Sequence, residues 1–209
     1  MVLLTTDQLQ AASKIRDHLT GWRAIEDLIT SVFEEHSQNE DRFIVLLKVR
    51  LLNQLYWTRI IAEDQVAQRI AQQNDLLAPL LALGNPKAVQ IIAECGIGRK
   101  EQVFASKYAH FHEPERFAIG DKYVDIALKA LKLQPWSRDR HKISIAEAYQ
   151  QFRNQIEAIA RERQTSLRNV DHYLWLKGQK EAAAIRGVDK LNAEVQWSMR
   201  QHPNLWGRL

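Results

Sequence analysis

A short stretch, "ECGIGRKEQ" at residues 94–102, joins two glycines to two adjacent cations. Because glycine has no Cβ, Gly96 and Gly98 can form a tight turn and leave backbone N–H groups bare. Bare N–H groups followed by a helix N-terminus bind anions such as a nucleic acid phosphate, and Arg99 adds positive charge there. The stretch therefore predicts a DNA-backbone contact at these three residues. The alternative is a plain helix–helix turn that needs glycine only for its geometry.

Lys100 follows the turn and would occupy the first turn of a helix expected at residues 99–112. The helix dipole and Arg99 both disfavour a proton on an amine at this position. A neutral lysine is a nucleophile that can form a Schiff base with a sugar aldehyde or C1′. Lys100 is therefore a candidate catalytic amine, and the alternative is a solvated lysine that touches phosphate.

Two further residues could take part in the same chemistry. Asp121, in "FAIGDKYV", stands at the start of the next expected helix, where it could cap that helix. Its carboxylate could also stabilise positive charge on a sugar and move protons. Lys107, in "FASKYAHFH", lies two helical turns beyond Lys100 and nearly on the same face, so it is a rival amine. Its other role would be to cover apolar surface with its stem.

The sequence "GIGRK", followed by an apolar stretch and Asp121, resembles the helix–hairpin–helix and Gly/Pro…Asp motif of base-excision DNA glycosylases. It is similar to the endonuclease III and 8-oxoguanine glycosylase branches, and the resemblance extends from Val89 to Val124. In that family the lysine after the hairpin is the Schiff-base nucleophile, and the aspartate is the catalytic carboxylate. By position, the resemblance implies these roles for Lys100 and Asp121.

The same resemblance implies a fold and a partner. The family fold is two-lobed and all-α, with the helix–hairpin–helix here at about residues 86–112. Double-stranded DNA with a damaged base binds across the cleft, and the target base is flipped out. Because Cys95 is the only cysteine, the chain would belong to a branch without the iron–sulfur cluster of endonuclease III.

Three other groups of residues are candidates for binding. Trp175, in "SLRNVDHYLWLKG", could stack on a base in a pocket or could dock its helix on the core. Arg138 and Arg140, behind a tryptophan in "PWSRDRHK", could contact phosphates or form a solvated charge run. His110 and His112 are two residues apart and do not share a helix face, so we expect helix-end hydrogen bonds there. The sequence predicts no metal and no cofactor.

The elements that must position these residues are all expected to be helices. Helical periodicity dominates, and no convincing period-2 strand pattern is present. We expect a single all-α domain over residues 1–209, which can divide into two helical lobes. The expected helices cover residues 5–20, 22–36, 40–62, 63–73, 75–83, 86–94, 99–112, 121–133, 144–163, 167–177 and 188–201, with breaks near Gly178 and Gly187.

Composition narrows the class of partner. The net charge is +4 with a pI of about 9.2, and the positive excess lies after residue 100, which favours a polyanion. No apolar run reaches the roughly 20 residues that span a bilayer, and the N-terminus lacks a basic n-region, so we expect a cytoplasmic protein without a membrane partner. The first functional hypothesis is a DNA glycosylase, with or without lyase activity. The alternatives are a non-catalytic helix–hairpin–helix DNA-binding protein and a helical protein that binds another protein.

Overall fold

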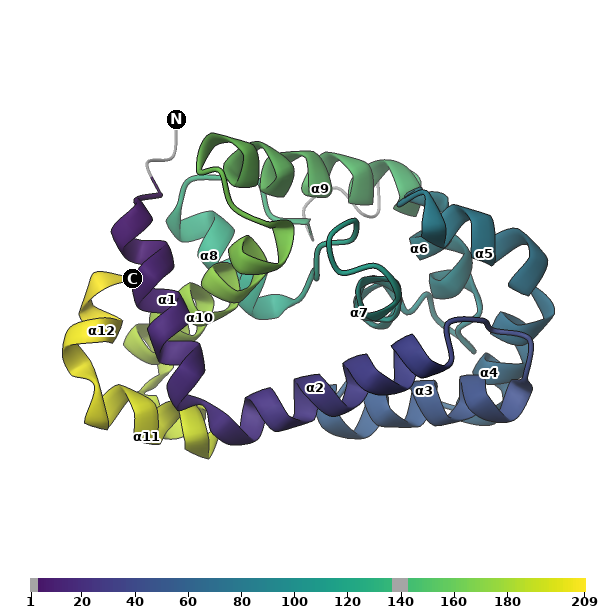
Figure 1. Ribbon diagram of the computed structural model, residues 1–209, viewed down its shortest axis with the longest axis horizontal. Coiled ribbons are helices and arrows are strands. Elements are labelled where there is room, and N and C mark those ends of the chain that lie inside the picture. Colours follow the sequence, from purple (N-terminus) through teal and green to yellow (C-terminus); the bar gives the residue numbers. More distant parts are fainter. Residues whose placement is uncertain (1–3, 137–142) are drawn as a thin grey trace. The chain divides into compact units, whose positions relative to one another are not determined.

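The computed structural model describes residues 4–136 and 143–209, and every regular element in these ranges is a helix (Figure 1). The all-α prediction is therefore confirmed. None of the helices in the described ranges combines the length and the apolar character needed to cross a membrane. The helices are α1 (Thr6–His18), α2 (Thr20–Glu35), α3 (Arg42–Tyr56), α4 (Glu63–Gln72), α5 (Asn74–Ala82), α6 (Lys87–Glu94), α7 (Gln102–His112), α8 (Lys122–Ala130), α9 (Ile145–Glu162), α10 (Leu167–Arg186), the 3-10 helix η2 (Val188–Lys190), α11 (Ala193–Gln201) and α12 (Pro203–Arg208).

The helices form two compact units. In the described residues, the terminal unit comprises 4–24, 120–136 and 151–209, and the middle unit comprises 25–119 and 143–150. Helices α2 and α9 each contribute residues to both units.

Helix α7 is the core of the middle unit. It packs against α3 and α6, and Figure 1 shows it nearly end-on. Nearly every residue of α7 is buried, which is typical of a helix enclosed by its neighbours. The buried residues are Gln102, Phe104, Ala105, Ser106, Lys107, Tyr108, Ala109, His110 and Phe111.

The terminal unit depends on a close contact between α8 and α10. A Cβ at Gly178 would collide with the backbone carbonyl of Tyr123, so only glycine lets the two helices approach this closely. Helix α10 continues through Gly178 and ends at Gly187, which has a φ of 90°. The predicted break at Gly187 is confirmed, and the predicted break near Gly178 is wrong because that glycine serves packing.

The C-terminal helices close the terminal unit around its N-terminal helices. Helix α1 packs against α10 and α12, and α1 and α12 lie side by side in Figure 1. The carboxylate of Glu194 accepts hydrogen bonds from the backbone N–H groups of Gly21 (2.7 Å) and Trp22 (2.9 Å). Because Leu19, which precedes α2, has no side-chain oxygen, Glu194 supplies the N-terminal cap of that helix from a distant part of the chain.

The long helix predicted at 40–62 ends earlier than expected. Helix α3 stops at Tyr56, because Trp57 takes a left-handed conformation with a φ of 51°. Residues 57–62 then form an irregular loop in which Arg59 and Ala62 also have positive φ angles, 59° and 56°. The apolar run hid this boundary, since Trp57 and Ile61 read as a continuation of the helix.

Candidate functional site

The glycine turn lies where the sequence predicts it, between α6 and α7 in the middle unit. Gly98 has a φ of 76°, and a Cβ there would have no neighbour within 4 Å. Glycine is therefore favoured at this position by its backbone conformation. A Cβ on Gly96 would collide with the carbonyl oxygen of Arg99, so glycine is needed there because no larger residue fits. Arg69 donates a hydrogen bond to the Gly96 carbonyl (3.2 Å), which ties the turn to α4.

Arg99 joins this turn to loop 57–62. Its guanidinium donates to the Glu101 carboxylate and, at 2.8 Å, to the backbone carbonyl of Arg59. About half of the Arg99 side chain is exposed, at 51%. The turn and the loop therefore form one continuous surface, and Arg99 is partly committed to holding it together.

Lys100 lies outside the helix where it was expected. Helix α7 begins at Gln102. The residues before it belong to the turn, because the backbone N–H of Glu101 donates to the Ala93 carbonyl of α6 (3.0 Å). The expectation that Lys100 occupies the first turn of this helix is wrong. The Lys100 amine is exposed and lies 3.4 Å from a carboxylate oxygen of Glu94. This environment favours an ordinary ion pair over a desolvated nucleophile.

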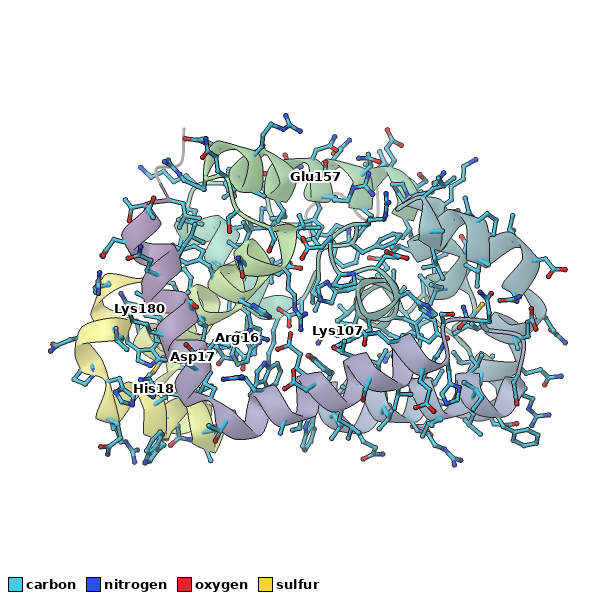
Figure 2. The ribbon with its side chains drawn as sticks, in the orientation of Figure 1. Arg16, Asp17, His18, Lys107, Glu157 and Lys180 are labelled. Carbon is cyan, nitrogen blue, oxygen red and sulfur yellow. The ribbon has the colours of Figure 1, made fainter. Side chains whose placement is uncertain are left out.

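Lys107 has a contrasting environment in the middle of α7, where Figure 2 labels it. Its side chain is only 5% exposed, and its amine lies 4.6 Å from the centre of the Tyr56 ring. Tyr56 in turn makes an edge contact with Phe111, one helical turn beyond Lys107 on α7. The amine is thus held against an aromatic face at the point where α3 gives way to loop 57–62.

Loop 57–62 is a feature that sequence reasoning missed. Asn53 fixes its backbone by accepting hydrogen bonds from the Thr58 hydroxyl (3.1 Å) and the Ile60 N–H (2.8 Å). The loop presents Trp57, which is 79% exposed, and Ile61. Left-handed non-glycine residues are strained and cluster at functional sites. The only sequence signal was Asn53, a residue type that bonds to nearby backbone instead of extending a helix.

Asp121 lies in the terminal unit and caps α8. One of its oxygens accepts hydrogen bonds from the backbone N–H groups of Tyr123 (2.8 Å) and Val124 (3.0 Å). The capping role named as an alternative is therefore present, in a half-buried position. These two hydrogen bonds fix the orientation of the carboxylate at the N-terminus of α8.

Trp175 belongs to an aromatic cluster in the terminal unit. Its indole stacks on that of Trp22, with ring centres 4.5 Å apart and planes 18° apart. Tyr123, in the first turn of α8, meets Trp175 edge-on at 6.4 Å. Both tryptophans are half-buried, so the cluster contributes to packing and also keeps part of its aromatic surface in solvent.

The remaining predicted residues have varied outcomes. His110 is buried, and its Nδ1 lies 2.7 Å from the Phe117 carbonyl, which matches the expected helix-end hydrogen bond. In residues 4–136 and 143–209, no three His, Cys, Asp or Glu side chains are placed to hold a metal ion. Arg138 and Arg140 lie outside the described residues.

Residues 7–116 match the HI_0787_N family, which is described as an N-terminal domain. The chain belongs to this family. An uncharacterized protein of Haemophilus influenzae is 33% identical over 147 residues, which cover 68% of this chain and 70% of that protein. No solved structure matches the chain significantly.

The residues that match HI_0787_N include the candidates around the glycine turn and leave out Asp121 and Trp175. Its boundaries take in α1 to α7, and so include the glycine turn, loop 57–62, Lys100 and Lys107. Asp121 and the Trp175 cluster lie beyond the matched residues. The family assignment therefore covers the middle-unit candidates and carries no functional description of them.

Proposed function

We propose that this chain is a DNA-repair glycosylase that acts on a damaged base and cleaves abasic sites through a lysine Schiff base. In this proposal, α6, the glycine turn and α7 are the helix–hairpin–helix of a two-lobed glycosylase-like fold. Lys107 is the reactive amine. The observation that carries the proposal is the buried Lys107 amine against Tyr56, on the helix that follows the turn.

The environment of each lysine favours Lys107 over Lys100. Reactive lysines are shielded from water, because burial disfavours the charged form of an amine. Lys107 meets this condition, whereas Lys100 is exposed beside Glu94. The resemblance implies the role for Lys100 by position, and Lys107 was the rival because it lies on nearly the same helical face.

The proposed chemistry takes place at the Lys107 amine. The Lys107 nitrogen forms a bond to C1′ as the glycosidic C–N bond breaks, and the base leaves with the bonding electrons and takes up a proton. Opening of the sugar and loss of the amine protons then give the Schiff base.

The surface formed by the turn and loop 57–62 supports DNA as the partner. Trp57 is exposed in the same loop as Arg59, whose carbonyl accepts a hydrogen bond from Arg99 of the turn. Aromatic side chains stack on or wedge between bases, and flanking arginines contact phosphates. Contacts to phosphates position DNA without reading its sequence, so we expect binding that is independent of sequence.

The test is borohydride trapping on duplex DNA that contains an abasic site or a damaged base. We expect a covalent adduct with the natural protein and with Lys100→Ala, and no adduct with Lys107→Ala. Circular dichroism checks that both variants are folded. An adduct that survives Lys107→Ala rules out this assignment, and loss in Lys100→Ala alone would return the role to Lys100.

A second candidate function is non-catalytic binding of DNA by the helix–hairpin–helix. The cap that Asp121 provides to α8 favours it, because that carboxylate already has a structural role. This function predicts salt-dependent binding that does not depend on sequence. It also predicts that no DNA substrate gives a trapped adduct.

A further inference from the structure

Lys48, in the middle of α3, is a buried amine that the proposed chemistry does not use. It has no exposed surface. Its Nζ donates hydrogen bonds to the backbone carbonyl of Gln38 (3.1 Å) and to the side-chain oxygen of Asn39 (3.1 Å). Both acceptors are neutral, and no carboxylate of the described residues lies within ion-pairing distance of this nitrogen.

Asn39 links this amine to the rest of the middle unit. It lies in the connection between α2 and α3, residues 36–41, and is 1% exposed. The Tyr108 hydroxyl donates to the same Asn39 oxygen (2.7 Å), and the Asn39 backbone N–H donates to the Asn74 side chain (3.0 Å). We call Lys48, Asn39, Asn74 and Tyr108 the Asn39 cluster. It attaches one connection to α3, α5 and α7.

A buried ammonium without a carboxylate is costly, whereas a neutral amine can make the same two hydrogen bonds. Consistent with this, burial lowers the pKa of Lys48 from 10.5 to about 7. The ring of Phe33, 5.0 Å from Nζ, supplies the only aromatic face that contacts the amine in the described residues.

The groups that face Lys48 from the packed elements do not neutralise its charge. Helix α2 supplies Phe33, and α5 reaches the cluster through the neutral Asn74. Helix α7 supplies two titratable groups. Burial and then the charge of Lys48 lower the pKa of His112 well below 6.5, and burial and then Cys95 raise the pKa of Tyr108 well above 10. Both groups therefore remain uncharged at neutral pH, and Lys48 is the group that titrates.

We propose that the Asn39 cluster is a pH-sensitive latch, in which the neutral Lys48 amine keeps residues 36–41 closed and proton uptake by Lys48 favours local opening. In the open state, water reaches the amine, which then binds a proton as an ordinary lysine does. In the closed state, the amine binds a proton only once the pH has fallen to about 7. Opening therefore becomes easier as the pH falls from about 10 to about 7, by about tenfold per pH unit, and is constant below that range.

Hydrogen exchange of the whole chain tests the latch. Its readout is the protection factor of the Asn39 amide, measured between pH 7.5 and 9.5 under conditions where exchange reports the opening equilibrium. We expect protection to fall about tenfold for each pH unit lowered in the natural protein. The slope should be retained in Tyr108→Phe, which removes a hydrogen bond on the same Asn39 oxygen without removing the amine, and absent in Lys48→Met.

Two results would overturn the latch. One is protection that does not change with pH in the natural protein, and the other is an equal slope in Lys48→Met. If Lys48→Met does not fold, NMR of the Lys48 amine in the natural protein decides the question. A titration near pH 7 supports the latch, and a titration above pH 10 contradicts it.

Discussion

Lys100 and Lys48 carry the same amine in opposite environments. Lys100 is exposed beside the Glu94 carboxylate, whereas Lys48 is fully buried among neutral oxygens. In the sequence, Lys100 draws attention because it follows two glycines, and Lys48 is hidden inside the apolar run "FIVLLKVRLL". Burial controls how strongly an amine holds its proton, and burial depends on packing between elements that a local pattern does not contain.

The buried amine of Lys48 leads to a prediction about stability. The unfolded chain keeps a proton on Lys48 up to its ordinary pKa of 10.5, while the folded protein releases it near 7. Folding therefore releases a proton between these values, and the free energy of unfolding should rise with pH, by up to about 1.4 kcal/mol per pH unit. Urea unfolding at pH 7, 8 and 9 measures this slope, and Lys48→Met should have a clearly smaller one.

Two neighbouring groups set the limits of that measurement. Burial raises the pKa of the Cys95 thiol from 9.0 to about 11, so above pH 9 the unfolded chain ionises first and this contribution opposes the rise due to Lys48. The lowered pKa of His112 has the opposite consequence in acid, where stability falls as the pH drops below 6.5. Equal slopes for the natural protein and Lys48→Met between pH 7 and 9 would contradict the role given to Lys48.

At the scale of elements, Gly178 determines how closely α8 and α10 pack. A methyl group there would overlap the Tyr123 carbonyl, so we expect Gly178→Ala to lower the free energy of unfolding by about 1–3 kcal/mol, the usual cost of overpacking. Chemical denaturation of both proteins measures the difference.

Gly207 provides the matched control for this substitution. It also lies in a helix, α12, and a Cβ there would meet nothing within 4 Å. Gly207→Ala should therefore leave stability unchanged or slightly raised, since alanine favours helix. Equal losses in the two variants would mean that the close contact of α8 and α10 is not what Gly178 provides.

Loop 57–62 is the element that most directly tests DNA as the partner. We expect Trp57→Ala to weaken binding to duplex DNA by about tenfold, because one stacked base contributes about 1–3 kcal/mol. Phe43→Ala is the control, since Phe43 is 73% exposed, similar to Trp57 at 79%, but lies on the regular helix α3. Fluorescence anisotropy at low salt measures both. Binding unchanged in Trp57→Ala, or equally weakened in Phe43→Ala, would remove the loop from the proposed interface.

At the scale of the whole molecule, the terminal unit is assembled from three separate chain segments. Glu194 is one of the residues that join them, because it caps α2 from α11. We expect Glu194→Ala to lower the free energy of unfolding by about 1 kcal/mol, the usual value of an N-terminal cap. Glu115→Ala, which removes an exposed carboxylate, should change it by less than about 0.5 kcal/mol. Thermal unfolding compares the two variants, and equal shifts would contradict the capping role.

The features that local chemistry determines were predictable from the sequence. Asp121 caps α8 at the helix start that the sequence places there, and Thr5 caps α1, with Gln8 completing a capping box. Features that depend on distant partners were not. In the sequence Gly178 looks like a helix break, and its packing role depends on the contact with α8. The end of α3 at the left-handed Trp57 depends on the hydrogen bonds between Asn53 and the loop. For the same reason, the sequence nominated two amines for the site and did not show that Lys107 is buried and Lys100 exposed.

The division of the terminal unit also has a consequence for how the protein is made. Helix α1 buries Ala11, Ala12 and Ile15, and the partners that it packs against are α10 and α12. During synthesis, its apolar stripe leaves the ribosome long before either partner, while most of the middle unit is contiguous in the chain and can begin to collapse. Until α12 has been translated, the apolar stripe of α1 lacks one of the two helices that cover it in the folded protein.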